Sequence, residues 1–173
     1  MSVEEARRLD ASDELLEAAA LYEEAIRCES TDLSVYLDLA VLYFVLLDFG
    51  EVHARGLPRT FQDEAWNRVR ELLAEAESRF GPNADVAFWK RYINFAYLGD
   101  PFSEHDCRVL CAKAESLDPH FFLFAATQGK ESREEATRLL AVVESGETAR
   151  KRYVRSVLKS PALRFGPSPA PNL

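Results

Sequence analysis

"AAALYEEAIRCESTDLSVYLDLAVLYF", residues 18–44, places small and aromatic residues at helical spacing on both sides of a polar corner. Ala18 and Tyr22 lie about one turn apart before the corner, and Ala40 and Tyr43 do so after it. Tiny residues let two helix axes approach closely, and aromatic rings one turn away fill the space beside them. The stretch therefore predicts two closely packed helices.

The rest of the chain predicts the same kind of structure. With 173 residues, of which 47% are hydrophobic, it can bury one good core, and its length fits a single domain. Only 7 Gly and 8 Pro interrupt long segments of helical periodicity, which favours an all-α protein. The helices are expected at about 12–28, 32–47, 58–79, 84–98, 103–116, 120–127, 132–145 and 147–159. Residues 1–159 form the predicted domain, and the Pro-rich tail 160–173 is predicted to be disordered.

The spacing resembles the tetratricopeptide repeat (TPR). Tyr36-x-x-Leu39-Ala40-x-x-Tyr43 is similar to the first helix of such a repeat, and the segment before it to a second helix. A looser copy, Cys107-x-x-x-Cys111-x-x-Ala114, ends in proline at position 119. The resemblance implies antiparallel helix pairs stacked as a short TPR-like superhelix, with the extra residues of the repeat mainly in the connection 48–60.

Charge and composition exclude several classes of partner. The net charge is −8, but six of the 21 basic residues and none of the 29 acidic ones follow Glu147, so residues 1–147 carry −14. A body this acidic repels a phosphate backbone, which argues against nucleic acid. No signal peptide or membrane-spanning run is recognisable, and three cysteines fit reduced thiols. We therefore expect a cytoplasmic protein.

The basic C-terminal helix is the one hint of a membrane. "TARKRYVRSVLK" places Tyr153, Val154, Val157 and Leu158 on one face. Such a helix either caps the stack or lies on an anionic membrane surface. Capping is favoured, because the acidic body can accept the basic charges internally.

The resemblance also implies a binding groove, because the first helices of stacked repeats line the concave side. The predicted groove consists of Leu37, Asp38, Val41, Phe44, Lys90, Arg91, Asn94 and Tyr97. Lys90 and Arg91 are expected to meet an anion, either an internal carboxylate or a carboxylate of the ligand. A second candidate is "HFFLFAAT", residues 120–127, which predicts either a short helix with two buried rings and a third partly exposed, or a hydrophobic anchor point for a partner.

Catalytic chemistry has little support in the sequence. Cys107 and Cys111 share a helix face and could bind a metal ion with His105 or His120 nearby in sequence, but they also occupy packing positions, and free cysteine behaves as a small hydrophobe. No recognisable nucleophile, phosphate-loop or metalloprotease motif occurs. We expect no enzyme activity and no cofactor.

These observations predict an adaptor or scaffold that binds a peptide segment or protein surface. Two alternatives remain. One is a metal-dependent enzyme that uses Cys107, Cys111 and a histidine. The other is a dedicated inhibitor or immunity-type protein for one basic partner.

Overall fold

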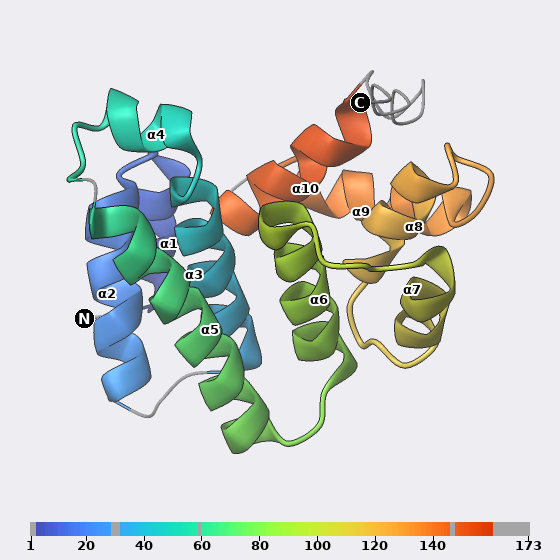
Figure 1. The fold of residues 1–173 in the computed structure, drawn as a ribbon, viewed down its shortest axis with the longest axis horizontal. Coiled ribbons are helices and arrows are strands. Elements are labelled where there is room, and N and C mark those ends of the chain that lie inside the picture. Colours follow the sequence, from blue (N-terminus) through green and yellow to red (C-terminus); the bar gives the residue numbers. More distant parts are fainter. Residues whose placement is uncertain (1–2, 29–31, 59, 146–147, 161–173) are drawn as a thin grey trace, which may run out of the picture.

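A computed structural model describes residues 3–28, 32–58, 60–145 and 148–160 (Figure 1). Within these ranges the chain forms helices and no strand, so the predicted all-α class is confirmed. None of these helices is both long and apolar enough to cross a membrane. The predicted Pro-rich tail lies outside the described residues, except for Ser160. The helices are α1 (Val3–Ala11), α2 (Leu15–Arg27), α3 (Leu33–Leu46), α4 (Phe49–Ala54), α5 (Thr60–Phe80), α6 (Ala84–Leu98), α7 (Glu104–Cys111), α8 (Pro119–Ala126), α9 (Arg133–Val143) and α10 (Ala149–Lys159).

The helices form two groups with α6 between them (Figure 1). In the first group α1 packs on α2, and α3 packs between α2 and α5. In the second group α7, α8 and α9 contact one another in chain order. Helix α10 crosses from one group to the other, because it contacts α3 as well as α8 and α9. One continuous hydrophobic core extends from Ala6 to Val154.

Several helix ends follow from local capping chemistry. Asp32 caps α3 by accepting from the N–H of Ser34, and Ser103 caps α7 in a capping box with Asp106. Gly99, with φ of 76°, ends α6 in the left-handed conformation that glycine adopts without strain. Helix α2 differs from the prediction, because it begins after Glu14, and no side chain caps it.

The other differences arise from contacts distant in sequence. Helices α1 and α4 were not predicted, because both are short and one is largely polar. The helix expected to reach about residue 116 ends at Cys111. Beyond it, Asp85 accepts hydrogen bonds from the N–H groups of Glu115 and Ser116, which therefore do not continue the helical ladder.

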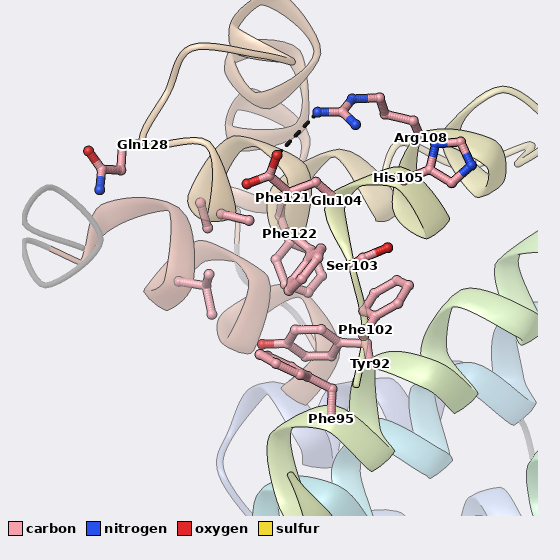
Figure 2. Close-up of a pocket in the computed structure, with 13 residues that line it drawn as sticks. Tyr92, Phe95, Phe102, Ser103, Glu104, His105, Arg108, Phe121, Phe122 and Gln128 are labelled. Atoms are coloured by element: carbon pink, nitrogen blue, oxygen red, sulfur yellow. Dashed lines mark hydrogen bonds and ion pairs between the residues drawn. The ribbon is translucent and has the colours of Figure 1, made fainter. Parts of the chain in front are cut away.

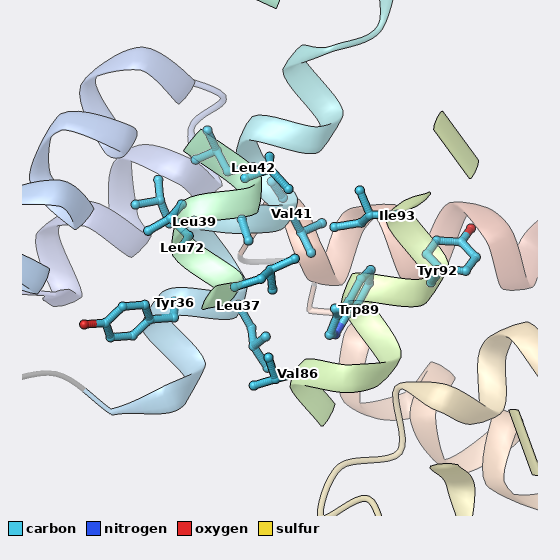
Figure 3. Close-up of a cluster of buried hydrophobic side chains, with 14 of the residues drawn as sticks. Tyr36, Leu37, Leu39, Val41, Leu42, Leu72, Val86, Trp89, Tyr92 and Ile93 are labelled. Carbon is cyan, nitrogen blue, oxygen red and sulfur yellow. The ribbon is translucent and has the colours of Figure 1, made fainter. Parts of the chain in front are cut away.

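Helix α3 is buried on every side from Val35 to Leu42, and this corrects the predicted groove. A helix that is apolar all round is a core helix, and α3 carries only two polar residues, Ser34 and Asp38. Leu37 and Val41 point at α6 in Figure 3, and both are at most 3% exposed. The face expected to line a groove is thus filled by a helix of the chain itself, and these two residues do not form a binding surface.

A network of buried charges fixes α10. The Nε of Arg150 lies 2.9 Å from the Asp38 carboxylate on α3, and its Nη1 lies 3.5 Å from Asp118, the residue before α8. Arg152 donates to Asp10 of α1 at 2.9 Å. The basic helix therefore pairs with the acidic body, as expected of a cap.

Removing Arg150 should strongly destabilise the fold. Arg150→Ala leaves Asp118 buried without its cation and Asp38 with only the longer contact of 3.6 Å to Arg7, and breaking buried pairs in this way costs about 3–5 kcal/mol. The control is Arg155→Ala, which removes only an exposed bond to the carbonyl of Glu144 and should cost under about 1 kcal/mol. Urea unfolding measures both, and equal losses for the two variants would contradict the role given to Arg150.

The pKa of Asp10 predicts a pH-dependent stability. Burial raises this pKa to about 6, against the opposing effect of Arg152 and the N–H of Ala149. Folded Asp10 therefore holds a proton that the unfolded chain releases near pH 4, so its ionisation lowers the free energy of unfolding as pH rises from about 4 to 6. Asp10→Asn should gain up to about 3 kcal/mol relative to wild type across this window. Exposed Asp100→Asn is the control, and parallel pH profiles for wild type and Asp10→Asn would refute the prediction.

Candidate functional site

A pocket of about 900 Å³ opens between α6, α7, α8 and the last turns of α10 (Figure 2). Aromatic side chains form most of its wall. They come from the end of α6, from the loop before α7 and from the start of α8. The aromatic lining residues are Tyr92, Phe95, Phe102, Phe121 and Phe122.

The rings hold one another in place. Phe102 stacks on Phe122 with centroids 4.6 Å apart, and Tyr92 meets Phe121 edge to face at 4.9 Å. Phe95 packs on Phe122 at 5.5 Å but remains 39% exposed at the opening. Offset and edge-to-face aromatic pairs add to the energy of burial, so this wall is preformed.

Residues 120–127 were predicted to form either a short helix with two buried rings or an anchor point for a partner, and α8 has the features of the first alternative. Pro119 opens the helix, as the missing N–H of proline allows at that position. Phe121 and Phe122 are buried, whereas Phe124 is only partly buried. The pocket uses the two buried rings, so the apolar run in the sequence was a signal for the site. Phe102 carried no such signal, because it lies in a loop.

Polar groups form the rim of the pocket on the α7 side. Arg108 binds Glu131 through two hydrogen bonds of 2.8 and 2.7 Å, and Glu104 through one of 3.1 Å. This ion pair lowers the pKa of Glu131. His105 and Gln128 complete the rim. The charges of the rim are thus largely compensated, and the apolar wall dominates the pocket.

A second pocket lies on the other side of a pair of tyrosines. The hydroxyls of Tyr92 and Tyr153 are 2.6 Å apart, and burial raises the pKa of both phenols. Beyond Tyr153 is a pocket of about 550 Å³, which is also lined by Phe44, Tyr97 and the carboxylates of Asp48 and Glu51. It lies between α3 and the end of α6, with α4 at its edge.

The residues of the predicted groove do not come together in one surface. Phe44 and Tyr97 line the second pocket. Lys90 and Arg91 point outward and pair with carboxylates of the chain, Glu77 at 2.9 Å and Asp106 at 3.1 Å.

The other four groove residues are not accessible in the expected way. Asp38 is 2% exposed and binds Arg150, so it belongs to the charge network and not to a binding surface. Leu37 and Val41 lie in the core, and Asn94 is half-buried. The groove was predicted on the assumption that α3 has an open face, which it lacks.

The two cysteines of α7 differ in environment. Their sulfurs are 3.9 Å apart, with Cys107 buried and Cys111 half-buried. Hydrogen bonding to Cys111 and burial raise the pKa of the Cys107 thiol, and the same hydrogen bond lowers the pKa of Cys111. His120 faces Ser132 at 2.8 Å. In the part of the chain that the structure describes, no three His, Cys, Asp or Glu side chains are arranged to hold a metal ion.

Alkylation should distinguish the three thiols. At neutral pH we expect iodoacetamide to modify exposed Cys28 and half-buried Cys111 in the folded protein, because exposure and thiolate character control reactivity. Cys107 should react only after denaturation, which provides the internal control. Mass spectrometry of digested samples reads out each site, and rapid modification of Cys107 in the folded protein would contradict the placement of its side chain.

Comparison with protein-family models, curated proteins and solved structures yields no match to this chain. The tetratricopeptide resemblance therefore stays a prediction.

Proposed function

We propose that this chain is a protein–protein interaction module that holds a short proline-containing segment of a partner, with a phenylalanine or leucine anchor, in the aromatic pocket. The observation that carries the proposal is the preformed wall of five aromatic residues around about 900 Å³. The proposed site is next to α7 and α8, whereas the groove predicted from the sequence consists of residues of α3 and α6.

The chemistry of the wall supports this class of ligand. Aromatic-lined grooves bind proline-rich segments, because an extended segment that is already rigid loses little conformational entropy on binding. Binding sites for small ligands are typically concave and mostly apolar, with few polar groups. The stacked pair Phe102 and Phe122 also needs no rearrangement, which reduces the cost of binding.

The compensated rim supports binding rather than catalysis. Arg108 is held by Glu104 and Glu131, and the hydroxyl of Ser103 donates to Asp106 at 2.6 Å. These groups orient one another and the start of α7. The proposal keeps the cytoplasmic setting, without nucleic acid or a membrane, that the sequence predicts.

The test is selection of short peptides from a random displayed library on the immobilised full chain. We expect the selected peptides to combine proline with phenylalanine or leucine, and their affinity is then measured by titration against variants. Phe95→Ala should weaken binding by about tenfold or more, as expected when a central aromatic contact is lost.

Tyr97→Ala is the matched control, because Tyr97 lies on the same helix, is 40% exposed and lines only the second pocket. It should leave the affinity unchanged. Circular dichroism confirms that both variants are folded. Loss of binding in Tyr97→Ala but not in Phe95→Ala would move the site to the second pocket and refute the proposal.

A further inference from the structure

The aromatic pocket lies where the described chain ends. Val157 of α10 lines the pocket, and α10 ends two residues later at Lys159. The last described residue, Ser160, therefore directly follows a helix whose final turn borders the pocket. The composition of the sequence after α10 is consequently relevant to what fills the pocket.

The sequence after α10 has the composition that the pocket accommodates. "SPALRFGPSPAPNL", residues 160–173, contains four prolines and three larger apolar residues, of which Leu163 and Phe165 lie nearest to α10 and Leu173 is the last residue. Arg164 is its only charged side chain. It therefore belongs to the same chemical class as the partner segment proposed above, a proline-rich segment with apolar anchors.

We propose that the chain's own C-terminal segment is a ligand of the aromatic pocket, with Leu163 and Phe165 as the anchors. This inference rests on the proposed function only in that the same pocket is used. Leu163 follows Lys159, the last residue of α10, by four residues, and four extended residues span up to about 14 Å. The tether is thus long enough to turn back from the end of α10 into the pocket.

Tethering and charge both favour this occupant. A ligand joined to its site by a short linker has an effective concentration in the millimolar range, so even a weak intrinsic affinity leads to substantial occupancy. Arg164 carries a positive charge toward a body whose residues 1–159, including the five basic residues of α10, have a net charge of −9. Long-range attraction therefore brings the segment toward the body before the anchors bind.

A C-terminal segment that occupies the aromatic pocket competes with any partner segment for the same site. A partner segment must displace Leu163 and Phe165, so its apparent affinity is reduced by the fraction of chains in which the pocket is already filled. A partner segment then fills the pocket in most chains only if it binds more tightly than the tethered C-terminal segment.

The direct test uses NMR on the full chain with ¹³C-labelled leucine methyl groups. We expect nuclear Overhauser effects between the Leu163 methyl groups and the rings of Phe95 and Phe122. A mixture of labelled and unlabelled chains distinguishes binding within one chain from exchange between chains. Absence of these contacts, or contacts only between different chains, would overturn the inference.

A second measurement uses the peptides selected for the proposed function. The double variant Leu163→Asp, Phe165→Asp should bind them several-fold more tightly than wild type, because the competitor is removed. The control Ser168→Asp, Ala170→Asp adds the same charge beyond the anchors and should leave the affinity unchanged. Equal affinity in both double variants and wild type contradicts the competition.

The two proposals fail in distinguishable ways. If peptides bind but the intramolecular contacts of Leu163 are absent, the interaction module stands and the inference about the C-terminal segment is wrong. If the contacts are present but no peptide is selected, the segment occupies the pocket and the proposed partner binding fails.

Discussion

The position of Arg150 between Asp38 and Asp118 joins three parts of the chain that are far apart in sequence. A buried ion pair is weak evidence for added stability, because desolvation offsets much of the attraction. Its effect on geometry is clearer. An unpaired carboxylate at either position would be costly, so α10 is held at one register relative to α3 and α8. The second arginine, Arg152, extends the same constraint to α1.

This constraint positions the candidate site. With α10 fixed, Val157 reaches the aromatic pocket and Tyr153 reaches the hydroxyl of Tyr92. Trp89 connects the network to the aromatic cluster, because its Nε1–H donates to Asp118 at 2.9 Å and its ring lies 5.7 Å from that of Phe121. Charge pairing and aromatic packing thus meet at Trp89, which packs against Phe121 of the pocket wall.

The features of the fold that could be predicted from the sequence are those that depend on residues close together in the chain. The all-α class followed from periodicity, and the limits of α3 and α6 followed from Asp32 and Gly99, whose chemistry acts on neighbouring residues. The early end of α7 was not predictable in this way, because it depends on Asp85, some thirty positions earlier.

The candidate site, too, could be predicted from the sequence only where neighbouring residues carry the signal. The apolar run at Phe121 and Phe122 marked one wall of the pocket, whereas Phe95 and Phe102 join it only through tertiary packing. The predicted groove failed at Leu37 because a repeat resemblance assumes an open helix face. The nearly continuous apolar sequence of α3 indicated instead a helix that is buried in the core.

The pairing of α1 with α10 also governs how the chain folds as it is made. The carboxylate of Asp10 accepts from the N–H of Ala149, 139 positions later, and is completely buried. During synthesis α1 is made before α10, so Asp10 at first has the hydroxyl of Tyr22, 3.4 Å away, but neither the N–H of Ala149 nor the guanidinium of Arg152. Contacts so distant in sequence slow folding, and the partly made chain exposes apolar surface in the meantime. The packing of α10 against α1 therefore forms only after all the intervening helices have been translated.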